Sequence, residues 1–251
     1  MNDSAMPSKI EQDHLLYEDE TGQVVGLYEV QMLDPVPSER IPRVQLLLRH
    51  SDIFVVYQAT LVLTAWGDDA GLDKLEELVD RRIHRVFEFA PHRIYGYDNV
   101  YDEFAGAVDI RRLVRTDKQA QVGRIYEKLL GLYGPCGFEG HLKYALLDYD
   151  FVTLAAPIDL AMTRALESNR IYLASQLLPP LARFSPQRAL ERSGTFSNLG
   201  RMTPNPEVNV AEALRWIPPE ESRPRLEKLT RHPDKVVADE ARASLAKLQS
   251  G

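Results

Sequence analysis

The residues best suited to binding chemistry lie between Ile94 and Phe104, where tyrosines alternate with carboxylates. Tyrosine offers a large contact area with one polar atom, and carboxylates complement surfaces rich in arginine and lysine. Phe54 and Tyr57 form a second aromatic pair, set off the apolar face of their expected helix. The sequence therefore predicts a partner-binding site made of Tyr95, Tyr97, Asp98, Tyr101, Asp102, Glu103, Phe54 and Tyr57.

A structural interpretation of these aromatic residues stays open beside the functional one. In that alternative, Tyr101 and Phe104 belong to the core and the carboxylates between them are solvated. Phe54 and Tyr57 then pack against a neighbouring helical hairpin and do not face a partner.

Signals for catalysis are weaker. Cys136 and His141 flank a glycine-rich loop at 131–140, but a thiolate nucleophile needs a base and an orienting group as well. The chain lacks the common zinc-protease, phosphate-loop and serine-hydrolase motifs. A single cysteine excludes an intrachain disulfide and a multi-cysteine zinc site. His50 and His232 end helices, where imidazoles bond the last carbonyls. We therefore expect no enzyme, no cofactor and no metal.

A short sequence motif that occurs twice indicates the elements that position these residues. Leu47-Leu-Arg-His50-Ser-Asp52 returns as Leu229-Thr-Arg-His232-Pro-Asp234. In each copy a helix ends at Arg-His, and the aspartate caps the next helix. Small and branched apolar residues then recur every four positions, as Val55, Ala59 and Leu63 and as Val237, Ala241 and Leu245.

Apolar periodicity predicts helices through most of the chain. Residues 14–33, with Thr21-Gly22 at their turn, predict a short β-hairpin, and the proline-rich connector 34–42 follows. Gly67 suits a left-handed helix cap. Residues 193–206 predict a long irregular segment. The expected helices span 43–49, 52–66, 71–89, 98–115, 118–133, 141–148, 155–167, 170–183, 207–217, 221–231 and 235–248.

The two copies of this motif resemble HEAT-like repeats, the antiparallel helix pairs related to armadillo-type solenoids. The chain departs from that pattern at 56–57 and 238–239, where the family often carries an arginine. The resemblance implies an all-α fold, a short HEAT-like α-solenoid of stacked antiparallel helix pairs that grips a partner. We expect an N-terminal segment with the hairpin at 1–42 and the solenoid at 43–251.

Charge is distributed unevenly within a net charge of −7. Residues 1–110 contain 21 acids and 9 bases, whereas residues 111–251 contain 16 acids and 21 bases. We expect the carboxylates of Asp68-Asp69 and Glu76-Glu77 to be solvated. An acidic end attracts a basic protein and repels nucleic acid. Neither a signal peptide nor an apolar span long enough for a membrane is present, so we expect a cytoplasmic protein without membrane contact.

These features together are similar to those of bacterial immunity proteins, which cover the active site of a toxin. We therefore expect a non-enzymatic protein-binding module that sequesters a basic toxin domain, one that attacks nucleic acid being the natural candidate. Two alternatives remain: a general scaffold or assembly adaptor, and an enzyme on a HEAT-like frame such as a chromophore lyase or a base-excision glycosylase. A glycosylase requires a basic groove, which the acidic N-terminal half does not favour.

Overall fold

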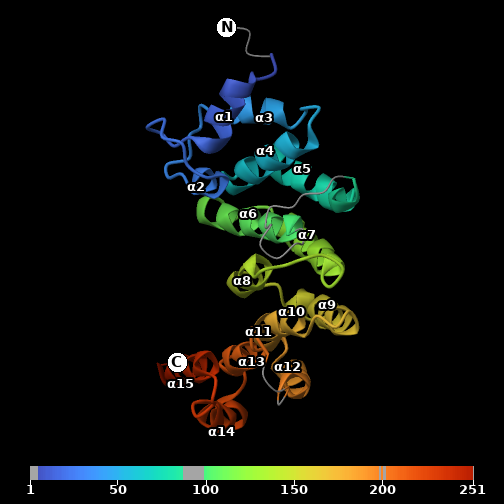
Figure 1. Ribbon diagram of the computed structural model, residues 1–251, viewed down its shortest axis with the longest axis vertical. Helices are drawn as coiled ribbons and strands as arrows, with labels where there is room; N and C mark the ends of the chain where they lie inside the picture. The colour runs from blue at the N-terminus through green and yellow to red at the C-terminus, as the bar shows by residue number, and fades with distance from the viewer. Residues whose placement is uncertain (1–4, 87–98, 198, 200–201, 251) are drawn as a thin grey trace. The chain divides into compact units, whose positions relative to one another are not determined.

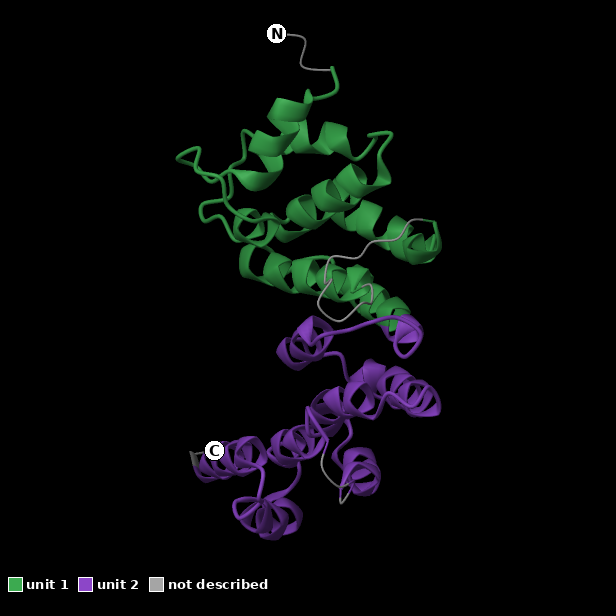
Figure 2. Ribbon diagram, in the orientation of Figure 1, with its two compact units in different colours: residues 1–129 green, residues 130–251 purple. Residues whose placement is uncertain are grey.

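The computed structural model describes residues 5–86, 99–197, 199 and 202–250 (Figure 1). These residues form helices packed on helices and contain no β-strand, so the all-α class is confirmed. Their contacts divide the chain into two compact units, residues 1–129 (unit 1) and residues 130–251 (unit 2) (Figure 2). Within unit 1, the first helices share a hydrophobic core with those that follow, while the expected boundary at residue 42 stays a prediction.

Unit 1 is built around one buried helix. Its helices are α1 (Lys9–Tyr17), α2 (Leu27–Gln31), α3 (Ile41–Leu47), α4 (Ile53–Ala65), α5 (Asp69–Asp80), α6 (Val100–Val114) and most of α7 (Gln119–Leu132), with a 3-10 turn at Ile83–Arg85. Helix α4 contacts α2, α3, α5 and α6, and every residue from Val55 to Ala65 is buried. A helix that is apolar on all sides is stable only when it is enclosed in this way.

Two local interactions fix the neighbours of α4. The indole N–H of Trp66 donates a 2.8 Å hydrogen bond to the carbonyl of Val30, which ties α2 to the end of α4. Helix α5 crosses α4 at Gly71, where an added Cβ would lie 2.5 Å from the Leu63 Cβ. As expected, Gly67 between the two helices adopts a left-handed conformation, with φ of 80°.

The N-terminal hairpin predicted at 14–33 is not formed. Helix α1 extends over its first residues to Tyr17, α2 covers Leu27–Gln31, and one isolated bridge joins Glu18 to Val24 between them. The chain does turn at Thr21-Gly22 as predicted. The Asp19 carboxylate stabilises this turn by accepting hydrogen bonds from the backbone N–H groups of Thr21 and Gln23. Two backbone hydrogen bonds also cross the turn, from the Asp19 N–H to the Gln23 carbonyl and from the Val25 N–H to the Tyr17 carbonyl, but this pairing does not extend into the helical residues on either side.

Unit 2 arranges its helices in two contacting sets. The contacts run from α8 to α11, α13 and α15 in succession. Helix α9 packs on α10 and α11, α12 on α11 and α13, and α14 on α13 and α15. The elements are α8 (His141–Asp148), α9 (Ala155–Glu167), α10 (Ile171–Gln176), α11 (Leu178–Phe184), α12 (Pro186–Ser193), α13 (Glu207–Leu214), α14 (Pro219–Leu229) and α15 (Lys235–Ser250), with 3-10 turns at Val152–Leu154 and Gly194–Phe196.

Sequence and structure differ at several helix ends. The helix expected over 170–183 is broken into α10 and α11 at Leu177, because the following Pro179 and Pro180 supply no backbone N–H. Helix α5 ends at Asp80, before Arg82 turns left-handed with φ of 52°. Helix α12 was not predicted, because the sequence analysis assigned no element to residues 184–192.

The two copies of the repeated motif, at residues 47–52 and 229–234, fold alike. The carboxylates of Asp52 and Asp234 accept hydrogen bonds from the N–H groups of Phe54 and Val236, so both predicted N-caps are confirmed. The histidine role differs from the prediction. In each copy the Nδ1 atom of His50 or His232 accepts a 3.0 Å hydrogen bond from the aspartate N–H, instead of bonding helix carbonyls.

Candidate functional site

The predicted aromatic pair of α4 is held inside unit 1. The Tyr57 side chain is only 2% exposed, and its ring lies 5.4 Å from that of Phe104. Phe54 is partly exposed and stacks on Tyr57 with a centroid separation of 6.1 Å. The alternative in which this pair packs against a neighbouring helix therefore describes Tyr57.

The predicted residues of α6 are buried as well. Tyr101 and Asp102 have almost no exposed surface, and Glu103 is half-buried. The Tyr101 hydroxyl is hydrogen bonded to Nδ1 of His84 at 2.5 Å, and burial lowers the pKa of this histidine. The remaining predicted residues, Tyr95, Tyr97 and Asp98, lie outside the described residues. The partner-binding role of the whole set stays a prediction.

Much of the acidity of α5 is neutralised within unit 1. Lys128 of α7 donates 2.8 Å hydrogen bonds to Glu76 and Asp80, which correct the expectation that such carboxylates are solvated. Partial burial would raise the pKa of Glu76, but the hydrogen bonds from Lys128 and Gln121 and the charges of Lys128 and Arg124 together outweigh it and lower the pKa. The buried Arg111 likewise contacts Asp69 and Asp117. These ion pairs hold α5 against α6 and α7, so the carboxylates concerned have cationic partners within unit 1.

A stretch of unit 1 rich in carboxylates that have no cationic partner lies at residues 18–39, here called the acidic surface. This stretch contains six carboxylates and no lysine, arginine or histidine. Arg40 follows it, but its buried guanidinium donates 2.7 Å hydrogen bonds to the main-chain carbonyls of Glu18 and Asp19. Four carboxylates have no hydrogen bond or ion pair with any described residue: Glu20, Glu29, Asp34 and Glu39.

Exposed apolar side chains accompany these carboxylates. Val24, Tyr28 and Met32 are 74%, 52% and 42% exposed, and two of them are one helical turn apart on α2 and its cap. Apolar and aromatic side chains beside unpaired charge are typical of a protein interface, because burial supplies affinity and charge supplies orientation. The acidic surface is therefore the candidate binding surface of unit 1.

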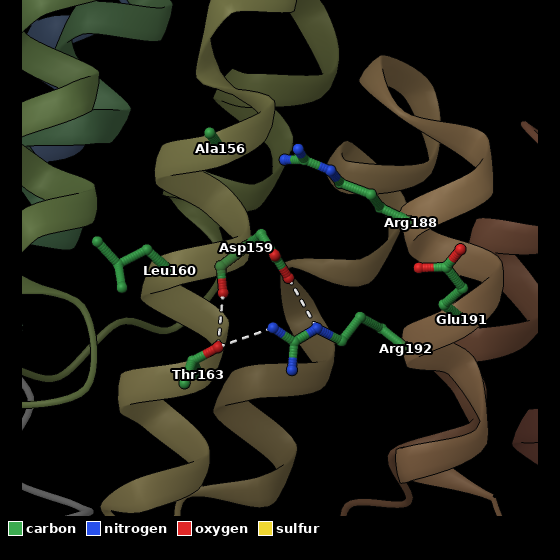
Figure 3. Close-up of a pocket in the computed structure, with 7 residues that line it drawn as sticks. All are labelled: Ala156, Asp159, Leu160, Thr163, Arg188, Glu191 and Arg192. Atoms are coloured by element: carbon green, nitrogen blue, oxygen red, sulfur yellow. Dashed lines mark hydrogen bonds and ion pairs between the residues drawn. The ribbon is translucent and has the colours of Figure 1, made fainter.

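Unit 2 carries a groove of about 600 Å³ between α9 and α12 (Figure 3). Arg192 crosses from α12 and donates hydrogen bonds to the Asp159 carboxylate at 2.7 Å and the Thr163 hydroxyl at 2.9 Å. Arg188 reaches toward Ala156 and has no ion pair with a described residue. The groove is open and its charges balance, so it selects no particular ligand.

A buried polar network joins α8, α10 and α13 in unit 2. The ammonium of Lys143, only 7% exposed, donates to Asn209 at 2.9 Å and forms an ion pair with Glu212. Asn209 in turn donates to the Ser175 hydroxyl, and Arg215 bonds the second oxygen of Glu212. Each charge has its partner, so this network positions helices.

The described residues do not assemble a recognisable reaction centre. Cys136 is buried, and its carbonyl accepts a hydrogen bond from Arg170. No group of three histidine, cysteine or carboxylate side chains suited to a metal ion occurs in the described part of the chain. Among the described helices, none is both long enough and apolar enough to cross a membrane.

Comparison with known proteins identified no related protein, so the candidate site rests on the residues of this chain alone. Scans against protein-family models, curated proteins and solved structures found no match for this chain. The acidic surface was missed by sequence reasoning because 14–33 was interpreted as a hairpin. The absence of any basic side chain between residues 18 and 39 was the available signal.

Proposed function

We propose that this chain is a protein-binding module of HEAT-like helix pairs, and that its acidic surface holds a basic protein. The observation that carries the proposal is the acidic surface, with four carboxylates that have no ion pair with a described residue and three exposed apolar side chains. Unit 1 contains 23 acids and 15 bases and unit 2 contains 14 acids and 15 bases, so the excess negative charge belongs to unit 1.

The architecture supports this proposal through its packing. In unit 2, successive helices of one set contact each other and are covered by helices of a second set, as stacked antiparallel pairs would be. Such stacking leaves extended surfaces that suit macromolecules better than small substrates. Within this class we propose an immunity protein, whose partner is a basic toxin domain and whose binding is fast and strongly dependent on salt.

The test is a titration of the chain with the product of the gene directly upstream, at about 0.05 M and about 0.5 M salt. The key variant carries Glu20→Gln, Glu29→Gln, Asp34→Asn and Glu39→Gln. Exposed ion pairs are each worth about 0.2–1 kcal/mol, so the variant should lose about 1–4 kcal/mol, or roughly fivefold to several hundredfold in Kd.

A matched control removes four other carboxylates, through Glu127→Gln, Asp150→Asn, Glu167→Gln and Glu221→Gln. These residues are exposed and lie outside the acidic surface. The control should keep the wild-type affinity if the location of the charge matters. Equal losses in both variants, or no basic partner at low salt, would contradict the proposal.

A further inference from the structure

A second groove in unit 2 lies between α13, α14 and the chain that precedes α13. It encloses about 1230 Å³, more than most small-molecule pockets. Its described lining residues come from the end of α12 and the turn after it, the segment before α13, α13 itself, and α14 with its connection to α15.

The groove has an apolar floor. Val210 and Leu214 of α13 are almost fully buried, with 5% and 1% of their surfaces exposed, yet both line the groove. Leu229 and Pro224 extend this floor along α14. An apolar floor rewards burial of a ligand side chain, which a bare inorganic anion cannot provide.

The charges at the rim are unequally satisfied. Among the acids, Glu207 is 2.9 Å from Nε2 of His232, and Asp234 caps α15 and accepts a 3.1 Å hydrogen bond from Asn205. Arg225 donates to the uncharged Ser193 hydroxyl at 3.0 Å. Lys228 and Arg231 have no side-chain hydrogen bond or ion pair with a described residue.

Only Glu227 opposes these cations with a carboxylate that has no such bond to a described residue. The lining is neutral by formal count, but its available groups carry an excess of positive charge. That excess complements a ligand with carboxylates. A polynucleotide would gain from the cations but place phosphates against the apolar floor and the engaged acids, so the lining favours a peptide.

We propose that this groove binds an acidic peptide segment of another protein, with an apolar side chain on the floor and carboxylates at Lys228 and Arg231. The site lies in unit 2 and has the opposite charge preference to the acidic surface of unit 1. The chain would then have two binding surfaces for partners of different chemistry. This inference does not depend on the function proposed for unit 1.

The experiment measures fluorescence anisotropy of a labelled peptide, Gly-Glu-Glu-Leu-Asp-Glu-Leu-Gly, with the full chain. Two comparison peptides replace the acids by lysine or the leucines by serine. We expect saturable binding of the first peptide and at least about tenfold weaker binding of either comparison. Equal binding of all three peptides, or no binding of the first, would overturn the proposal.

The variant Lys228→Glu/Arg231→Glu should weaken binding about tenfold or more, because attraction becomes repulsion. Its matched control is Arg188→Glu/Arg223→Glu, which reverses two exposed cations of the same unit outside this groove. The control should retain wild-type affinity. Equal effects of the two variants would refute a peptide site here. So would displacement of the peptide by duplex DNA that binds more tightly, or release of the peptide when the chain associates with itself.

Discussion

The substitution Gly71→Ala should weaken unit 1 by crowding the crossing of α4 and α5. The added methyl group would lie 2.5 Å from the Leu63 Cβ and 2.6 Å from the Thr64 backbone nitrogen. Carbon atoms pack best at about 3.5–4.0 Å, so the helices would have to separate by about 1 Å. Neither contacted atom belongs to a mobile side-chain end, because Leu63 and Thr64 are fully buried in α4.

The magnitude follows from two opposing effects. Overpacking of a well-packed core costs about 1–3 kcal/mol, and contact with a helix backbone places this case near the upper end. Alanine favours a helix over glycine by about 1 kcal/mol, which offsets part of the loss. We therefore expect Gly71→Ala to lower the free energy of unfolding of unit 1 by about 2 kcal/mol.

The assay is urea unfolding followed by tryptophan fluorescence. The chain has two tryptophans, Trp66 in unit 1 and Trp216 in unit 2, so Trp216→Phe leaves a reporter for unit 1 alone. Gly26→Ala is the control, because its added methyl would meet the Glu29 carboxylate at 2.4 Å. That carboxylate is the end of an exposed, flexible side chain and can move away. The reasoning would be refuted if Gly26→Ala lowered the free energy of unfolding as much as Gly71→Ala does, or if Gly71→Ala did not lower it.

Three further predictions concern stability. Asp52→Ala removes the acceptor for the Phe54 N–H and should lower the free energy of unfolding of unit 1 by about 1 kcal/mol in the same urea assay. Lys143→Met leaves Glu212 buried with only Arg215 as its cation, and should cost unit 2 about 2–4 kcal/mol, measured through Trp216; a neutral result would mean that the ion pair contributes nothing. The folded-state pKa of Glu76 lies below its usual value of 4.5, so its stabilisation is present above that pH and is lost as the pH falls through the folded pKa. Glu76→Gln should therefore flatten the pH dependence of unfolding in this acid range, and an unchanged profile would exclude Glu76 as its source.

Local signals predicted much of the fold. The Asp52 and Asp234 caps, the Gly67 turn and most helix positions follow from short-range chemistry that one stretch of chain contains. The break at Leu177 was not predicted, although the two prolines that follow it were the available signal. The N-terminal helices were missed because a turn signal at Thr21-Gly22 was extended to its flanks, although tertiary packing decides the structure of those flanks.

The candidate sites depended on contacts that sequence spacing does not show. Lys143 and Glu212 are far apart in the chain, and nothing near either residue indicates that they meet. The same holds for Glu76 and Lys128, whose pairing changes a solvated acid into part of a helix seam. Tyr57 and Tyr101 are of a residue type common in interfaces, but both are buried because of the position of α4 and α6 in unit 1.

The enclosure of α4 has a consequence for the motions of unit 1. Amide protons exchange with solvent when their hydrogen bonds open, and a helix covered on every side opens only when its surroundings come apart. The amides from Ala59 to Ala65 should therefore be the slowest in unit 1 to exchange with deuterium, and their rate should report the global unfolding of that unit. Exposed segments such as the 19–24 turn should exchange by small local openings, so a ligand on the acidic surface would protect the turn while leaving the rates of α4 set by the stability of the whole unit.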